Sequence, residues 1–122
     1  MLKIDSHQHF WKYTSDMDSW INDEMAVLRN DFMPKDLQPL LAQSGFDGCV
    51  AVQADQSPEE NNFLLQLAES NEFIKGVVGW VDLRAEDLSE QLSELNRFTK
   101  LKGFRHILQG EEDRALMLQP DF

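Results

Sequence analysis

The feature that most constrains the fold is a regular alternation of short apolar runs with longer amphipathic segments. The apolar runs start at Leu2, Gly48, Gly76 and Gly103, so successive starts lie 46, 28 and 27 residues apart. The second run, GCVAVQA, and the third, GVVGWVDL, are almost continuously apolar and rich in valine. Strands buried on both faces of a parallel sheet have this composition. We therefore expect four parallel strands.

The segment before the second run predicts a helix. MPKDLQPLLAQSG places Leu37, Leu40 and Leu41 at the spacing of one apolar helix face. Gly45 suits the left-handed position that follows a helix end. Pro39 is expected near the first turn, because deeper in the helix it would remove a hydrogen bond.

Two further helices are predicted between the later runs. SPEENNFLLQLAESN begins with Ser57 as N-cap, Pro58 at the first helical position and Glu60 completing a capping box. AEDLSEQLSELNRF repeats the scheme with leucines at 88, 92 and 95, and EEDRALML contains a further helix start.

The resulting β-α-β-α-β-α-β order indicates an α/β fold. A period of roughly 27 residues suits a doubly wound sheet or a (β/α)8 TIM barrel, and eight such units give on the order of 250 residues, the usual barrel size. The chain has 122 residues and supplies about four units. We therefore predict that residues 1–122 are the N-terminal half of a single barrel domain. An independent four-stranded domain is less favoured, because a parallel sheet needs both faces covered and both edges protected.

Charge and composition exclude several classes of partner. Lys and Arg number 11 against 22 Asp and Glu, a formal net charge of -11, so a nucleic-acid partner is not expected. No apolar run is long enough for a membrane span, and the N-terminus lacks the features of a signal peptide. The single cysteine, Cys49, cannot form an intramolecular disulfide and is expected in the core. A cytoplasmic protein is the default expectation, and the sequence is compatible with a homo-oligomer.

The connection after the first strand, from Phe10 to Met33, is unusually long for a compact domain. Connections of this length are usually functional or disordered. This one is rich in aromatic residues, which disordered segments avoid: Phe10, Trp11, Tyr13, Trp20 and Phe32. In a barrel it would fold over the C-terminal face, where active sites are built. It is predicted either to form an aromatic lid or pocket wall, or simply to anchor the loop to the barrel.

Two of the three histidines, His7 and His9, lie at the end of the first predicted strand. Strand alternation puts Asp5, His7 and His9 on one face, with the two histidines about 7 Å apart along the strand. Two imidazoles in this arrangement can reach one zinc ion at roughly 2.0–2.1 Å. A catalytic zinc takes about three protein ligands and an open position, so the pair needs further ligands from other strands.

The fourth run contributes Arg105 and His106, of which alternation lets only one face a barrel interior. An arginine there could grip a carboxylate or a sugar acid bidentately, or form a structural ion pair. His106 could equally be a hydrogen-bonded core histidine. Gln53, polar at the end of an apolar run, is expected either to bind a substrate hydroxyl or to hold a neighbouring strand end.

Two acidic residues at strand ends remain ambiguous between binding and capping. Trp80 and Asp82 share a face near the end of the third run, and Asp82 could contact substrate or cap the following helix. For Asp55, after the second run, nothing in the sequence separates the two roles.

Four motifs together carry a resemblance to a known family. DSHQHFW, VAVQA followed by an acidic helix start, GVVGWVDL and LKGFRHILQ run through all four predicted strands. In these motifs the chain resembles the amidohydrolase superfamily, specifically the amidohydrolase-2 group of sugar lactonases of the type that opens L-fuconolactone and L-rhamnonolactone. The first and last motifs are the most specific.

The resemblance implies a (β/α)8 barrel that hydrolyses a cyclic ester, or another C–O, C–N or C–C bond, at the barrel mouth in carbohydrate metabolism. It implies that His7 and His9 bind a divalent metal, often zinc, which activates the attacking water. Some relatives work without metal, and in them the pair would orient substrate. The remaining ligands and the acid/base Asp are expected beyond residue 122, so the chain alone is expected to be inactive. The residues expected to bind a small-molecule sugar lactone are Trp11, Gln53, Asp82, Arg105 and His106.

The leading functional prediction is therefore a lactonase. A decarboxylase or amide hydrolase of the same superfamily is the first alternative, because substrate choice depends on barrel loops. The second alternative is a non-catalytic, acidic, receiver-like domain built on Asp5, Asp55 and Asp82. That alternative assigns no role to His7, His9 or the aromatic connection.

Overall fold

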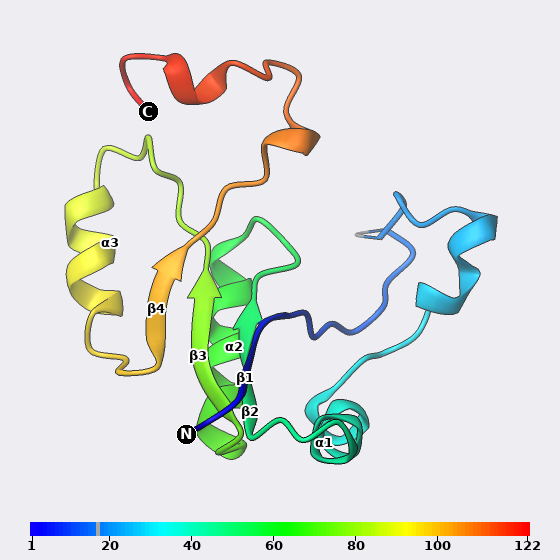
Figure 1. The fold of residues 1–122 in the computed structure, drawn as a ribbon. Helices are drawn as coiled ribbons and strands as arrows, with labels where there is room; N and C mark the ends of the chain where they lie inside the picture. The colour runs from blue at the N-terminus through cyan, green and yellow to red at the C-terminus, as the bar shows by residue number, and fades with distance from the viewer. Residues whose placement is uncertain (17) are drawn as a thin grey trace.

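The computed structural model describes residues 1–16 and 18–122, and its strands form one parallel sheet. The strands are β1 (Ile4–Gln8), β2 (Gly48–Val52), β3 (Ile74–Gly79) and β4 (Leu101–Phe104). Their order in the sheet is the order in the sequence, and every pairing is parallel. All four strands therefore point the same way, and their carboxyl ends share one rim (Figure 1). The predicted alternation of strand and helix is confirmed.

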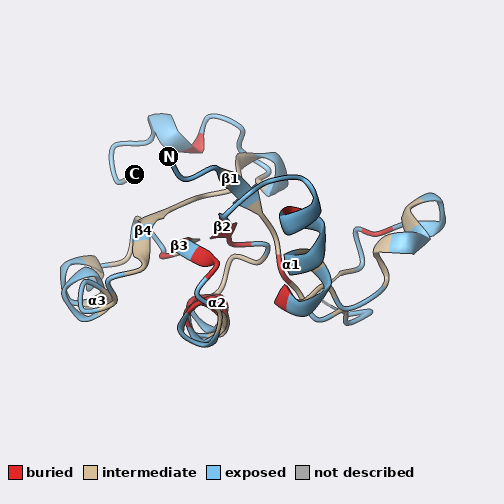
Figure 2. Cartoon of the chain, turned by 60° about the horizontal axis from the view of Figure 1, so that its bottom comes forward, coloured by how far each residue is buried: buried red, intermediate tan, exposed pale blue. Residues whose placement is uncertain are grey.

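Three α-helices connect the strands. They are α1 (Pro34–Gln43), α2 (Pro58–Ser70) and α3 (Leu88–Leu95), and short 3-10 turns occupy Asp23–Leu28, Leu108–Gly110 and Leu116–Leu118. The helices surround one side of the curved sheet, and the segment after β4 lies on the other (Figure 2). Within the described ranges, no helix has the length and apolar character needed to cross a bilayer.

The core lies between the sheet and the helices α1 and α2. Cys49 and Ala51 of β2 and Val77 of β3 are fully buried there, so the prediction for Cys49 is confirmed. Burial raises the pKa of the Cys49 thiol to about 11, which leaves it protonated and unreactive at neutral pH. The residues packed with them are Phe10, Leu41, Leu64, Leu65, Ala68, Phe73 and Ile74.

The opposite face of the sheet is less well covered. Val50 and Val78, which alternate with the core residues of β2 and β3, are only half-buried. Continuous valine-rich strands are typical of sheets covered on both faces. The second face therefore keeps apolar surface available for packing.

Two strands begin earlier than the apolar runs indicate. β3 starts at Ile74 rather than Gly76, and β4 starts at Leu101 rather than Gly103 and ends before Arg105. The exposed Lys75 and Lys102 interrupt the apolar pattern, so the runs seem to begin after them. Their backbones nevertheless belong to the strands, because a strand can point one side chain to solvent and the next to the core. Arg105 and His106 consequently follow strand β4 instead of lying within it.

The prediction for Pro39 is wrong. Helix α1 starts at Pro34, so Pro39 falls inside the helix rather than in its first turn. The first helical position, where the missing N–H of a proline costs nothing, is taken by Pro34. Pro39 therefore lies more than one turn into the helix. Leu40, expected on the apolar face, is 58% exposed, while Gly45 adopts the predicted left-handed conformation with φ 76°.

Helix α2 begins as predicted, except for Glu60. The Ser57 hydroxyl accepts a hydrogen bond from the Glu60 amide at 3.3 Å, and Pro58 is the first helical residue. The Glu60 carboxylate does not return to the Ser57 amide, so the predicted capping box is only half formed. It turns instead to the amides of Ala54 and Asp55, at 2.7 Å each.

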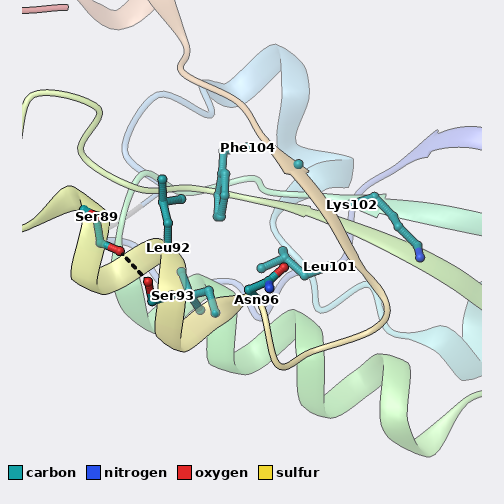
Figure 3. A pocket seen from close by; sticks show the side chains of 9 residues that line it. Ser89, Leu92, Ser93, Asn96, Leu101, Lys102 and Phe104 are labelled. Atoms are coloured by element: carbon teal, nitrogen blue, oxygen red, sulfur yellow. Dashed lines mark hydrogen bonds between the residues drawn. The ribbon is translucent and has the colours of Figure 1, made fainter.

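Helix α3 forms at the predicted place but is poorly covered. Leu92 is 37% exposed, and a groove of about 440 Å³ separates α3 from β4 (Figure 3). Its apolar lining includes Leu92, Leu101 and Phe104, none of which belongs to the predicted site. The helix start expected in EEDRALML forms only the short 3-10 turn Leu116–Leu118.

Candidate active site

The histidine pair converges at the carboxyl end of β1. The Nε2 atoms of His7 and His9 lie 3.1 Å apart, and the rings meet edge to face with centroids 4.8 Å apart. Residues two apart on a strand share a face, which explains why the two rings meet. The predicted juxtaposition is therefore present in the structure.

A local irregularity in β1 brings the rings together. The Asp5 carboxylate accepts hydrogen bonds from the His7 amide at 3.0 Å and from the Gln8 side chain at 2.6 Å. The pairing of β1 with β2 shifts register between Asp5 and Gln8. Such irregularities bend a strand and redirect side chains near functional sites. Asp5 thus shapes the strand end instead of facing the site as a free carboxylate.

The neighbouring strand fixes the orientation of His9. Its Nδ1 lies 2.9 Å from the carbonyl oxygen of Val52, at the end of β2. A carbonyl only accepts, so Nδ1 carries the proton and the lone pair of neutral His9 is on Nε2. The pKa of His9 is lowered, first by burial and then by the nearby charges of Arg105 and His7, against the opposing effect of the Val52 bond. His9 is therefore neutral at pH 7 and can donate its lone pair.

The two nitrogens fit a shared divalent metal. Two zinc–nitrogen contacts of roughly 2.0–2.1 Å can join nitrogens up to about 4.2 Å apart. The observed 3.1 Å lies within that limit. Histidine ligands commonly donate the other ring N–H to a backbone carbonyl, as His9 does to Val52. The described part of the chain brings no third His, Cys, Asp or Glu into the cluster, so further ligands must come from elsewhere.

Arg105 points toward the histidine pair, and His106 does not. The Nη1 of Arg105 lies 3.5 Å from the Nε2 of His7. The Nε and Nη2 of Arg105 are used by Gln53, at 2.8 Å to its side-chain oxygen and 2.6 Å to its backbone oxygen. Nε and Nη2 are therefore not free for a bidentate grip on a carboxylate. Burial lowers the pKa of the Arg105 guanidinium, and the group stays cationic.

Gln53 is fully buried, so its side chain faces Arg105 and not open space. Its amide N–H donates to Val78 at 2.8 Å, and its Nε2 lies 3.4 Å from the Asp55 carbonyl. Of the two roles that the sequence left open, the structure favours holding a neighbouring strand end.

An open cleft of about 810 Å³ adjoins these groups at the carboxyl rim. One wall is built from the long connection after β1, with Trp11, Trp20 and Leu28. The aromatic wall is anchored because Trp11 and Phe32 form an antiparallel bridge, with rings 4.6 Å apart. The rest of the lining includes His9, Asp55, Gln56, Arg105, Ile107 and Gln109. The connection from Phe10 to Met33 thus forms a wall of the cleft, and the Trp11–Phe32 bridge joins its two ends.

His106 and Asp82 lie outside the cleft. The Nε2 of His106 pairs with the Glu111 carboxylate at 2.7 Å, and its ring packs edge-on against Phe122 with centroids 5.7 Å apart. Asp82 is exposed and accepts the Arg84 amide at 3.0 Å in the turn before α3. The structure brings neither of them to the histidine pair. Asp82 caps a turn and not helix α3, which starts after Asp87.

Two buried polar residues that support the rim were missed from the sequence. Glu60 receives the amides of Ala54 and Asp55, and burial is the main cause that raises its pKa. Asn61 brackets Trp80, accepting its amide at 2.7 Å and donating to its carbonyl at 2.6 Å. The sequence does hold a signal for their burial. Both polar residues lie one helical turn before Leu64, which places them on the buried face of α2.

Comparison with known proteins identifies the family. The sequence model of the amidohydrolase family matches residues 4–120. The chain belongs to the amidohydrolase family.

Curated relatives of this amidohydrolase are named as lactonases. The chain is 48% identical over 122 residues to the L-fucono-1,5-lactonase of Burkholderia multivorans, covering 99% of this chain and 41% of the relative. It is 40% identical over 112 residues to the L-fucono-1,5-lactonase of Burkholderia ambifaria, covering 92% of this chain and 39% of the relative. The chain therefore spans about two-fifths of the length of the curated relatives it matches.

Solved amidohydrolase structures share the fold. A crystal structure of an amidohydrolase from Burkholderia multivorans with bound zinc matches with a TM-score of 0.94 and 47% identity, covering all of this chain and 43% of that one. A second crystal structure, with bound HEPES, matches with a TM-score of 0.93 and 47% identity, covering 100% of this chain and 42% of that one. The four parallel strands and the helices that alternate with them are thus half of an amidohydrolase (β/α)8 fold, as predicted.

Proposed function

We propose that this amidohydrolase chain forms the histidine end of a lactonase site that opens a sugar-acid lactone, such as L-fucono-1,5-lactone, in the full-length protein. The observation that carries the proposal is the convergence of His7 Nε2 and His9 Nε2 beside Arg105, at the mouth of an aromatic-walled cleft. The two lactonase names among the relatives support the choice of substrate.

His7 and His9 would hold a divalent metal, with zinc the expected ion. When bound, such an ion supplies Lewis-acid activation of water and of the ester carbonyl. His9 contributes by keeping its Nε2 lone pair aimed at the site through the Val52 bond. The zinc in a solved relative supports this assignment. The general base and the remaining ligands are expected beyond residue 122.

The cleft suits a small polyhydroxylated ring. Trp11 and Trp20 offer aromatic faces for the apolar side of such a ring, and Asp18 and Asp55 offer acceptors for its hydroxyls. The cation of Arg105 would stabilise negative charge that develops on a carbonyl oxygen during attack by water.

The direct test is to measure lactone hydrolysis by the full-length protein. The proton released when the lactone opens to the acid reports the rate. The panel should contain L-fucono-1,5-lactone, L-rhamnonolactone and lactones of unrelated sugars. We expect turnover of at least one sugar lactone and a loss of about 10²-fold or more in kcat/KM for His9→Ala. Gln38→Ala, an exposed change on α1, controls for differences in preparation.

Two outcomes would separate the parts of the proposal. Absence of turnover across the lactone panel, with activity on aromatic acids or amides, would favour a decarboxylase or amide hydrolase. Equal lactone turnover before and after exhaustive chelation would contradict the metal role of His7 and His9 and leave the substrate assignment intact.

A further inference from the structure

We propose that Gln53 is a positioning residue that orients Arg105 so that Nη1 alone is presented to the substrate carbonyl beside His7 and His9. The inference deepens the proposed function and rests on it. It starts from a fully buried amide directly after β2 that meets a cation from the segment after β4, 52 residues away.

The contacts between the two side chains are unusually complete. The Oε1 of Gln53 accepts from both Nε and Nη2 of Arg105, and the backbone oxygen of Gln53 accepts from Nη2 at 2.6 Å. Backbone bonds fix both partners: the Gln53 amide donates to Val78, and the Arg105 amide donates to Gly79 at 2.9 Å. The guanidinium plane is therefore set by one residue that does not itself reach the cleft.

This arrangement determines which part of Arg105 remains available. Within the described chain, the protein neighbour of Nη1 is the Nε2 of His7, at 3.5 Å. Nη1 can donate hydrogen bonds to a ligand, and Arg105 lines the same cleft as His9. One donor nitrogen beside the histidine pair suits a carbonyl oxygen that gains charge, whereas a bidentate grip on a carboxylate uses two nitrogens.

The kinetic signature follows from this geometry. A group that acts on developing charge affects kcat and kcat/KM together, whereas a group that only grips the substrate changes KM. A misplacement of about 1 Å can cost on the order of 10²-fold. Gln53→Met has a similar length but no oxygen acceptor, so we expect it to lower kcat by about 10- to 100-fold with little change in KM.

A double-mutant cycle in the full-length protein tests whether Gln53 acts through Arg105. Gln53→Met should lower kcat in the wild-type background and have little further effect when combined with Arg105→Met. Gln53→Glu keeps the acceptor oxygens and should restore the orientation lost in Gln53→Met. Asn61→Ala is the matched control, because this buried amide holds the end of β3 through Trp80. Its effect should be the same with Arg105 or with Arg105→Met.

A spectroscopic measurement tests the geometry independently of activity. The Arg105 Nε–H should give a slowly exchanging signal in the nitrogen–proton NMR spectrum, identified by its absence in Arg105→Lys. We expect the signal to persist in Gln53→Glu and to lose its protection in Gln53→Met.

The outcomes are distinguishable. Additive effects of Gln53→Met and Arg105→Met, or a rise in KM at constant kcat, would overturn the positioning role. An unprotected Arg105 Nε–H in the wild type would do the same. If the wild type hydrolyses no lactone, the proposed function fails, and the protection of Nε–H still decides whether Gln53 holds Arg105.

Discussion

At the scale of single residues, hydrogen bonds to the end of one neighbouring strand, β2, decide which nitrogens of His9 and Arg105 remain available. The Val52 carbonyl takes the Nδ1 proton of His9, and Gln53 takes two of the three nitrogens of Arg105. In both cases the partner belongs to the end of β2. The end of this strand therefore orients reactive groups that come from β1 and from the segment after β4.

The lowered pKa of His9 predicts a pH dependence of stability in the metal-free protein. Because the folded-state pKa lies below the ordinary 6.5, the unfolded chain binds more protons as the pH falls below that value. His9 therefore contributes stability above about pH 6.5 that is lost as the pH falls toward its folded-state pKa. We expect the Tm of chelated full-length protein to fall between pH 7 and pH 5.

His9→Asn is the matched variant for this measurement. An asparagine amide can still donate to the Val52 carbonyl but does not titrate. The Tm of His9→Asn should fall less over the same pH range than that of the wild type. Equal decreases in the two proteins would show that His9 is not the group responsible.

The close approach of β3 to α2 predicts a large effect of Gly79→Ala. A Cβ at position 79 would lie 2.2 Å from the Oδ1 of Asn61, which receives the Trp80 amide. Asn61 would have to move and release Trp80, at a cost of about 1–3 kcal/mol in the free energy of unfolding. Chemical denaturation measures this cost. Gly103→Ala is the control, since a Cβ there meets no atom within 4 Å, and an equal loss in both variants would contradict the account.

At the scale of elements, the loop between β2 and α2 is held by a buried carboxylate. Glu60 accepts the amides of Ala54 and Asp55, which line the cleft, while Gln56 from the same loop accepts the Ile107 amide. One loop therefore connects the start of helix α2 to the segment after β4. The helix–loop unit positions one side of the candidate site.

Glu60→Ala should loosen this loop. Hydrogen bonds to a charged group contribute roughly 1.5–3 kcal/mol, so we expect a loss of about 2 kcal/mol and faster hydrogen exchange at the amides of residues 54 and 55. Glu59→Ala removes a neighbouring, exposed charge from the same helical turn and serves as the control. Unchanged exchange in Glu60→Ala would show that the carboxylate does not hold the loop.

The sequence predicts the elements better than it predicts the connections between them. Strand β2 and the histidine pair follow from local periodicity, because burial and alternation act over a few residues. The partners of Glu60 and Arg105 could not be found this way. Glu60 has the position of a capping-box residue but turns to the preceding loop, and Arg105 meets a residue 52 positions away. Such pairings depend on how strands align in space, which local patterns do not encode.

At the scale of the whole molecule, the sheet has two edges, β1 and β4, within the described residues. The groove between α3 and β4 and the half-buried Val50 and Val78 leave apolar surface beside this sheet. Relatives are more than twice as long as the matched region, which fits a barrel completed by further βα units. Under the proposed function, the site at the rim is shared between this half and those further units.

This sharing predicts that the 122-residue chain alone has no lactonase activity. The described residues bring together only the two histidines proposed as metal ligands, and the proposal expects the remaining ligands and the base on later strands. The measurement is lactone hydrolysis by the isolated chain beside the full-length protein. Turnover by the isolated chain at a comparable kcat/KM would contradict a shared site.

The central proposal is that His7 and His9 together bind a divalent metal. The most direct measurement is an anomalous difference map at the zinc absorption edge, from crystals of the full-length protein grown with zinc. The account predicts one strong peak bonded to the Nε2 atoms of both histidines, with the Nδ1 of His9 still donating to Val52. A peak bound elsewhere, with the two Nε2 atoms free of metal, would contradict it.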